Sequence, residues 1–139
     1  NDIQAALGFE QIKRINDYIK RRNIIAERYN YAFKDLPLTK QLKRKGMTSS
    51  YHLYVITLNK NFSAKDHLKI FNKMRDKKIG VNLHYIPVHT QPYYKKIGFK
   101  KGDFPAAENY YKRAISLPMY PTLTRKDQNR VIESLKECL

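Results

Sequence analysis

Apolar residues recur at helical spacing over the first quarter of the chain. Asn1, followed three positions later by Gln4, resembles a capping box and predicts that a helix begins at the first residues. The apolar stripe slips near Gly8, so residues 1–35 form either one long helix or two helices with a bend, ending before Pro37. We expect this stripe to be packing surface rather than a ligand site. Its members are Ile3, Ala6, Leu7, Ile12, Ile15, Ile19, Ala26, Tyr29 and Phe33.

Three later segments have the pattern of β-strands. A polar, basic stretch over 36–50 is typical of a mobile surface loop. Residues 51–58 are then β-branched and aromatic on both faces, which predicts a central strand covered on both sides, with His52 as a structural histidine. Residues 80–85 alternate apolar and polar side chains and predict a second strand that a proline ends. Residues 114–117 predict a short third strand.

Start signals predict three further helices. Ser63 with Asp66 is a capping box for a helix to about residue 77, and Pro105 suits the first position of a helix to about residue 113. Thr124 with Asp127 is a third capping box, for the last helix. The expected buried stripes are Leu68, Ile70, Phe71 and Met74 in the first of these helices, and Val131, Ile132 and Leu135 in the last.

The order of elements predicts an α+β fold, with a short sheet of about three strands packed with helices and preceded by a long linking helix. We expect Gly80 to stop the second helix in the left-handed conformation. The chain divides into a long interdomain helix over 1–35 and a small α/β domain over 36–139. Since it has no initiator Met, we expect it to begin inside a longer protein; processing of a mature protein would give the same start.

The positive charge of the chain raises the question of whether it binds a polyanionic partner. The 139 residues carry a net charge of +16, which favours a polyanionic partner such as nucleic acid, an anionic membrane or a phosphate-bearing ligand. A Lys-rich compositional bias explains the same charge, because the only dense cluster is residues 40–45. No apolar run has membrane-spanning length and no secretory signal is recognised. Cys138 is interpreted as a spare thiol of a reducing cytosol.

Candidate chemistry is concentrated on the predicted strand over 80–85 and on the residues that follow it. No phosphate-binding glycine loop, HExxH, CxxC or GxSxG motif occurs, and the histidines lack the spacing of a metal site. What remains is a run of polar and aromatic groups that forms either a ligand wall or a set of half-buried packing residues with wet hydroxyls. Its members are Asn82, His84, Tyr85, His89, Gln91, Tyr93 and Tyr94.

Five segments, in order, resemble the C-terminal part of the DegT/StrS-type sugar-nucleotide aminotransferases, which use pyridoxal phosphate. They are NDIQAALGFEQIKRI, RRNIIAERYNYAF, YHLYVI, HYIPVHTQPYY and GDFPAAENYYKRAISLPMYPTLT. The fourth is most similar to the transaminases that make UDP-4-amino-4,6-dideoxy-N-acetyl-β-L-altrosamine in pseudaminic acid biosynthesis. The resemblance covers nearly the whole chain.

The resemblance implies a fold-type I homodimer whose N-terminal large domain, with the Schiff-base lysine and the pyridoxal 5'-phosphate site, is not in this sequence. We therefore assign no catalytic, cofactor-binding or metal-binding residue here, and expect the 139-residue chain alone to be inactive. The implied reaction transfers an amino group from glutamate to a UDP-linked 4-keto-6-deoxy amino sugar, in the cytoplasm, for bacterial surface glycan or flagellin glycosylation.

In the same resemblance, Asn82, Leu83, His84 and Tyr85 position the nucleotide sugar, and His89 and Tyr93 are further candidates for the same wall. No nucleic-acid or membrane partner is implied. The alternative from charge and aromatic content is a stand-alone basic domain that binds nucleic acid or serves as a scaffold without catalysis. Such a domain should show nucleic-acid binding that falls steeply with salt.

Overall fold

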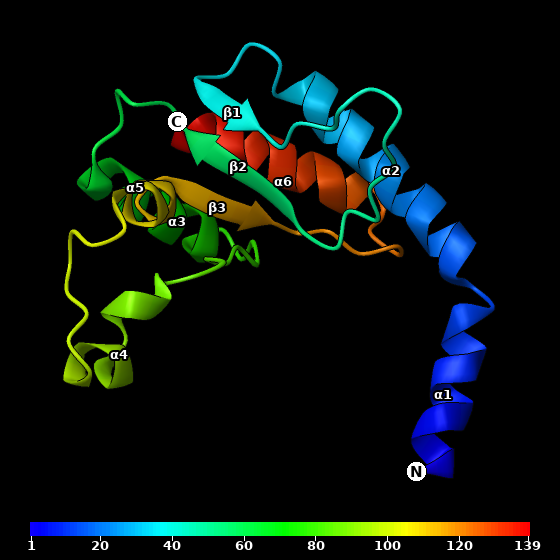
Figure 1. The fold of residues 1–139 in the computed structure, drawn as a ribbon. Helices are drawn as coiled ribbons and strands as arrows, with labels where there is room; N and C mark the ends of the chain where they lie inside the picture. The colour runs from blue at the N-terminus through cyan, green and yellow to red at the C-terminus, as the bar shows by residue number, and fades with distance from the viewer.

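A computed structural model describes all 139 residues and shows a three-stranded antiparallel sheet with helices packed around it (Figure 1). The strand order is β1-β2-β3, with Leu38 opposite Leu58 and Tyr54 opposite Leu117. The α+β prediction with a three-stranded sheet is therefore confirmed. The elements are α1 (Asp2–Ile12), α2 (Ile15–Ala32), β1 (Leu38–Lys40), β2 (Tyr54–Leu58), α3 (Ala64–Asp76), a 3-10 turn (Val88–Thr90), α4 (Pro92–Lys96), α5 (Pro105–Tyr111), β3 (Ala114–Leu117) and α6 (Arg125–Cys138).

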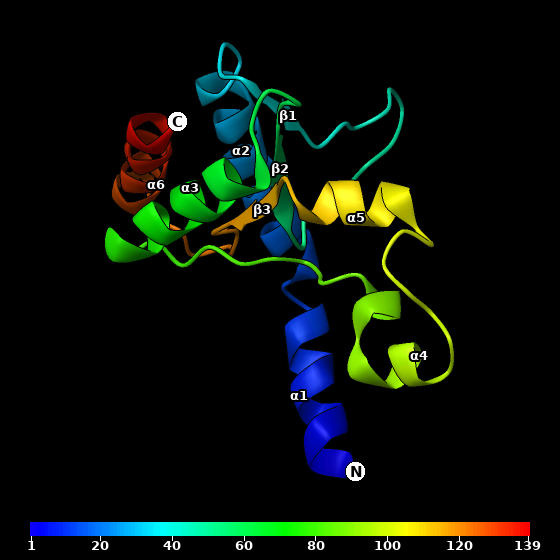
Figure 2. The same cartoon turned by 90° about the vertical axis from the view of Figure 1, so that its left-hand side faces the viewer.

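Helices α2, α3 and α6 cover one face of the sheet, and α5 lies beside the other face (Figure 2). Tyr54, Ile56 and Leu58 of β2 are fully buried beneath the helices, and the Tyr54 ring packs 4.9 Å from that of Tyr29 on α2. The opposite face of β2 is only half-buried. The prediction of a strand covered on both sides therefore holds fully for the helical face and only in part for the other.

The predicted long helix is two helices, and they differ in what they contact. The interruption lies at residues 13–14, beyond the expected position at Gly8. The Asn1 and Gln4 capping box is present, but no residue of α1 is buried. The C-terminal half of α2, in contrast, supplies core residues and is hydrogen bonded to α6, where Gln128 Nε2 donates to the Ile25 carbonyl over 2.8 Å. The apolar stripe is packing surface of this chain only in α2 and at Phe33, which follows it.

The sheet corrects two strand assignments. β1 lies within 36–50, which the sequence indicated to be loop; the rest of that stretch, residues 36–37 and 41–50, contains neither helix nor strand. Residues 80–85 form no strand, because a single bridge joins Asn82 to Ser116 of β3. β2 begins at Tyr54 rather than residue 51 because Tyr51 has φ +44°, outside the extended region.

Helix starts agree with the sequence signals, whereas two side-chain assignments do not. Ser63 caps α3 in a capping box, and the Thr124 hydroxyl accepts from the Asp127 N–H at the start of α6. The buried face of α3 includes His67, and Leu68 is instead 59% exposed. His52, which the sequence analysis interpreted as a structural histidine of the strand, is exposed and precedes β2. Lys78 (φ +59°), not Gly80, adopts the left-handed conformation after α3.

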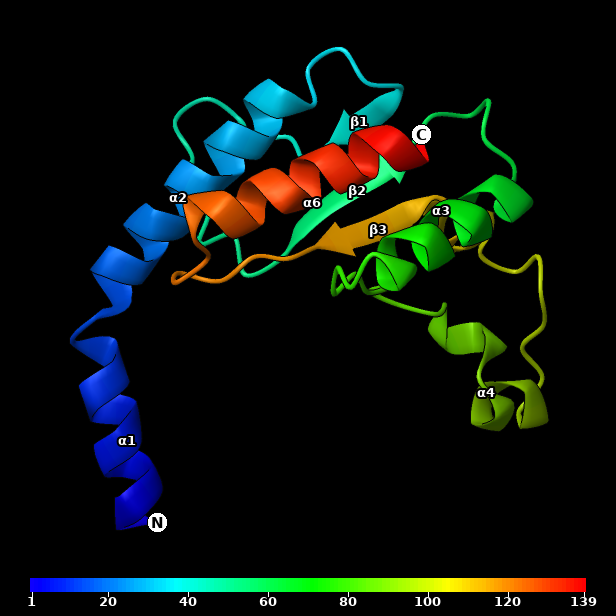
Figure 3. The ribbon, with the colours of Figure 1, turned by 180° about the vertical axis from the view of Figure 1, so that it is seen from behind.

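Residues 86–104, which we term the projecting segment, leave the body between Tyr85 and α5 and contain α4. Figures 1 and 3 show that the projecting segment and α1 extend from the body in the same general direction, on opposite sides of it. None of the helices is both long enough and apolar enough to cross a bilayer. Residues 82–85, the candidate substrate-positioning residues of the sequence analysis, lie between the body and the projecting segment.

Candidate functional site

Residues 82–85 are attached to the free edge of β3 through one residue pair. The Asn82 N–H donates to the Ser116 carbonyl over 3.1 Å, and the Ser116 N–H returns a bond of 2.9 Å to the Asn82 carbonyl. The next amide, Leu83 N–H, donates to Asn82 Oδ1 over 2.8 Å. The ladder stops after this pair because the next bond of an antiparallel ladder would come from His84, whose main chain forms no hydrogen bond with β3.

His84 turns back toward β3 after this single bridge. Its Nδ1 lies 2.8 Å from Ser116 Oγ, and its ring is 4.5 Å from the Tyr85 ring in an edge-to-face arrangement. Tyr85 itself is 71% exposed, whereas Ser116 is only 4% exposed. Buried Ser116 therefore orients the imidazole of His84, and this imidazole packs against the exposed ring of Tyr85.

The atoms that this segment leaves free are suited to an acceptor-rich ligand. Asn82 Oδ1 is occupied by the Leu83 amide, which leaves the Nδ2 hydrogens without a partner in the chain. His84 Nε2 and the Tyr85 hydroxyl likewise have no partner in the chain. Phosphate, hydroxyl and carbonyl oxygens are the groups that such donors bind.

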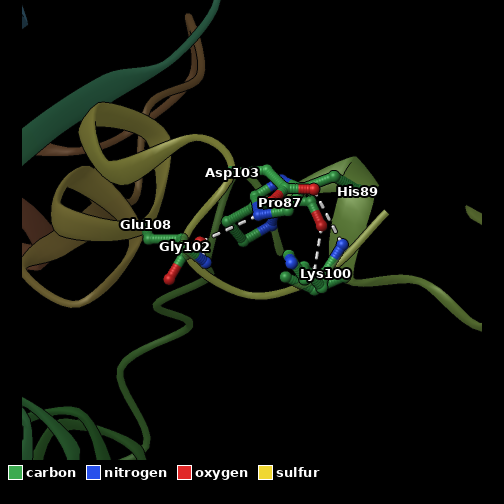
Figure 4. A network of polar contacts seen from close by, with 7 residues as sticks. Pro87, His89, Lys100, Gly102, Asp103 and Glu108 are labelled. Atoms are coloured by element: carbon green, nitrogen blue, oxygen red, sulfur yellow. Dashed lines mark hydrogen bonds and ion pairs between the residues drawn. The ribbon is translucent and has the colours of Figure 1, made fainter. Parts of the chain in front are cut away.

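His89 lies in a different environment from residues 82–85. It is 6% exposed, and its Nε2 donates to Glu108 Oε1 of α5 over 2.9 Å. The same carboxylate oxygen accepts from the Gly102 N–H over 2.6 Å (Figure 4). Glu108 thus joins the beginning and the end of the projecting segment to α5.

Aromatic side chains continue from His89 into the projecting segment. The His89 and Phe104 rings are 4.9 Å apart, and Phe104, Phe99 and Tyr94 follow as successive neighbours. They line an open apolar hollow of about 350 Å³ together with Val88 and Ala107. Tyr93 is 67% exposed and contacts Tyr94 edge-to-face, so its phenol points to the surface of α4.

The structure therefore divides the six candidate residues into two groups. Asn82, Leu83, His84 and Tyr85 form one continuous segment on β3, whereas His89 and Tyr93 belong to the projecting segment. The sequence analysis did not identify Ser116, which is hydrogen bonded to His84 of the first group, or Glu108, which is hydrogen bonded to His89 of the second. A signal existed for Ser116, because it is the one hydroxyl in the apolar strand AISL. Glu108 is the only acid in the helix PAAENYY, whose burial no local pattern reveals.

We predict that Glu108→Gln loosens the base of the projecting segment and removes one acid-sensitive contribution to stability. The Gly102 amide, and after it His89, lower the pKa of the Glu108 carboxyl. A lowered pKa means that this contribution is complete above the ordinary value of about 4.3 and is lost as the pH falls through the lowered value. Thermal unfolding measured between pH 3 and 7 should show a lower midpoint for the variant near neutrality and a flatter decline toward acid.

Glu133→Gln is the matched control, because Glu133 is an exposed acid on α6 whose only ion pair, with Lys136, spans 3.6 Å. It should follow the unmodified chain at every pH, since exposed ion pairs contribute little. Identical pH profiles for Glu108→Gln and the unmodified chain would contradict the role of Glu108.

The fold and the segment on β3 define a small α+β unit that presents hydrogen-bond donors at a sheet edge, and the comparisons with known proteins give its family. The sequence profile of the DegT/DnrJ/EryC1/StrS aminotransferase family matches residues 1–136. This chain belongs to the DegT/DnrJ/EryC1/StrS aminotransferase family, which confirms the resemblance seen in the sequence.

Individual relatives agree with this membership. SpsC of Bacillus subtilis, a spore coat polysaccharide biosynthesis protein, is 41% identical over 139 residues, which is 98% of this chain and 36% of SpsC. Spr1654 of Streptococcus pneumoniae, solved in its PMP form, superimposes with a TM-score of 0.94 at 28% identity over 99% of this chain and 35% of its own. Helicobacter pylori PseC, an aminotransferase involved in pseudoaminic acid biosynthesis, gives 0.90 at 28% identity, over 99% and 37%.

The chain spans little more than a third of the length of these relatives. Its own residues do not fit as the attachment site of pyridoxal phosphate. An amine that forms a Schiff base is typically activated in a desolvated pocket, and none of the lysines of this chain is buried.

Proposed function

We propose that this chain is the C-terminal part of a pyridoxal-phosphate-dependent aminotransferase that uses glutamate as donor and a UDP-linked 4-keto-6-deoxy amino sugar as acceptor. The cofactor, bound by another part of the full-length protein, supplies an electron sink for the amino transfer. Residues 82–85 hold the nucleotide sugar, and the enzyme works as a cytoplasmic homodimer in bacterial surface glycan or flagellin glycosylation.

The observation that carries this proposal is the set of free donors on residues 82–85 in a member of this family. Asn82 Nδ2, His84 Nε2 and the Tyr85 hydroxyl are unpartnered within the chain and belong to one short segment. A UDP-sugar presents diphosphate, hydroxyl and carbonyl oxygens, all of which accept from such donors. The net charge of +16 also favours capture of a diphosphate, although it exceeds what one diphosphate needs.

We propose that the two groups of candidate residues have different roles. Residues 82–85 orient the sugar, because an acceptor carbon held close to attack geometry reacts far faster than one that is misplaced. His89 is bonded to Glu108 and serves to fix the projecting segment, so that Tyr93 is the one exposed candidate there.

We propose that the structural unit begins near residue 14, since α2 shares the core of residues 36–139.

An assay of the full-length protein tests the proposal. The protein with pyridoxal phosphate and glutamate should convert a UDP-linked 4-keto-6-deoxy amino sugar to the amine, with one 2-oxoglutarate released for each sugar aminated. The 139-residue chain alone should release none. Turnover of small 2-oxo acids without turnover of any nucleotide-linked keto sugar would overturn the proposed substrate class, and stoichiometric turnover by the short chain would overturn the assignment of roles.

A further inference from the structure

Ser116 is the single residue of the body that forms hydrogen bonds with residues 82–85. Its main chain exchanges two hydrogen bonds with Asn82, of 2.9 and 3.1 Å, and its hydroxyl oxygen lies 2.8 Å from His84 Nδ1. It belongs to β3, where all four residues are buried, and is itself 4% exposed. The register of the segment and the orientation of the imidazole therefore depend on one strand position.

The direction of the Ser116–His84 hydrogen bond follows from what else the hydroxyl contacts. Nδ1 of His84 is the only hydrogen-bond partner of the Ser116 hydroxyl. If Nδ1 carried a hydrogen and donated it, the buried O–H hydrogen would have no acceptor, which is the costly arrangement for a buried donor. If the hydroxyl donates instead, both groups are satisfied. The neutral imidazole then carries its hydrogen on Nε2.

We propose that Ser116 is a positioning residue that fixes His84 as the Nε2–H tautomer and so makes Nε2 a hydrogen-bond donor toward the ligand. Nε2 and the Asn82 Nδ2 group then present donors on the same short segment. The segment accordingly selects a ligand whose facing group is an acceptor oxygen and disfavours one that presents an N–H or O–H hydrogen at that point. The inference rests on the proposed function only for the identity of the ligand, a nucleoside-diphosphate sugar.

Nitrogen-15 NMR of histidine-labelled full-length protein tests the tautomer without any substrate. At about pH 8, where imidazole groups are mainly neutral, His84 should show a protonated-type Nε2 and an unprotonated-type Nδ1, with the resonances assigned by their loss in His84→Gln. Ser116→Ala should shift both resonances toward the average of a tautomer mixture, and Ser116→Thr, which keeps the hydroxyl, should restore them. A protonated Nδ1 in the unmodified protein, or unchanged resonances in Ser116→Ala, would overturn the proposal.

Kinetics give a readout that a merely structural serine would not produce. Ser116→Ala should raise KM for the nucleotide sugar roughly threefold to tenfold, the effect of one lost hydrogen bond, and leave the half-reaction with glutamate unchanged. Ser134→Ala, a matched change at a buried serine of α6, should alter neither. Equal losses in both half-reactions, or an unchanged KM, would refute the positioning role. If no nucleotide sugar is turned over, the proposed function fails while the NMR experiment still decides the role of Ser116.

Discussion

A chain that begins at residue 36 will fail to fold, whereas a chain that begins at residue 14 will fold. The physical reason is the different packing of the two N-terminal helices. α1 has no buried residue, so its removal exposes no core. α2 contributes Ile25, Ala26 and Tyr29, and Phe33 directly follows the helix; all four are almost completely buried in the core of the sheet and its helices.

The loss of residues 1–35 removes about as much stabilisation as a domain of this size has in total. Truncating one large buried side chain to Ala costs roughly 2–5 kcal/mol, and removal of residues 1–35 takes away three such side chains at once. The Tyr29 hydroxyl, which donates to the Pro118 carbonyl over 3.0 Å, and the Ile25 carbonyl that binds Gln128 are lost as well. Since the total stability of a domain is about 5–15 kcal/mol, the remainder should not hold its native packing.

Near-ultraviolet circular dichroism and thermal unfolding of the two truncated chains measure this difference. Residues 14–139 should retain a tertiary signal and one cooperative transition close to that of residues 1–139. Residues 36–139 should show neither. A cooperative transition of residues 36–139 would restore the boundary that the sequence suggested, and loss of structure in residues 14–139 would show that α1 stabilises the unit.

Sequence predicted best those features that neighbouring residues decide. The starts of α1, α3 and α6 depend on a side chain and an amide three positions apart, and each expected cap is present. Pro105 likewise occupies the first turn of α5. Such contacts are local in the chain, so the residue types alone reveal them.

Features that depend on distant pairing were missed. β1 has three residues, and it is a strand only because Leu38 and Lys40 pair with Leu58 and Ile56. Residues 80–85 have the better alternating pattern, yet β3 offers them a single partner at Ser116. Alternation indicates which side chains could share a face of a strand, but the presence of the strand depends on backbone partners elsewhere in the chain.

The candidate site shows the same division. Resemblance to a family indicated residues 82–85 and His89 together, because they share one motif in the sequence. The structure separates them, since His84 is bonded to β3 and His89 to α5, 19 positions further along the chain. The polar partners that decide this, Ser116 and Glu108, lie in other elements, and no pattern near either histidine indicates them.

His84 has the largest predicted effect on catalysis of any residue in this chain. Its Nε2 has no partner within the chain, and Ser116 holds the ring from the other nitrogen. A hydrogen bond from such a group to a charged oxygen contributes about 1.5–3 kcal/mol, and loss of the ring also releases the edge-to-face contact of Tyr85. Since the chain contains no buried lysine that could hold the cofactor, this loss should affect the sugar and not cofactor binding.

In the full-length protein, if it has the proposed activity, His84→Ala should therefore lower kcat/KM for the nucleotide sugar roughly 10-fold to 100-fold. The absorbance of the bound cofactor and the rate of its reaction with glutamate should not change. His52→Ala is the matched control, because His52 is an exposed histidine whose imidazole has no hydrogen-bond partner in the chain, and it should leave both half-reactions intact. Stopped-flow absorbance separates the two half-reactions. Loss of cofactor absorbance in His84→Ala would place this residue at the cofactor, and an unchanged kcat/KM would remove residues 82–85 from the sugar-binding wall.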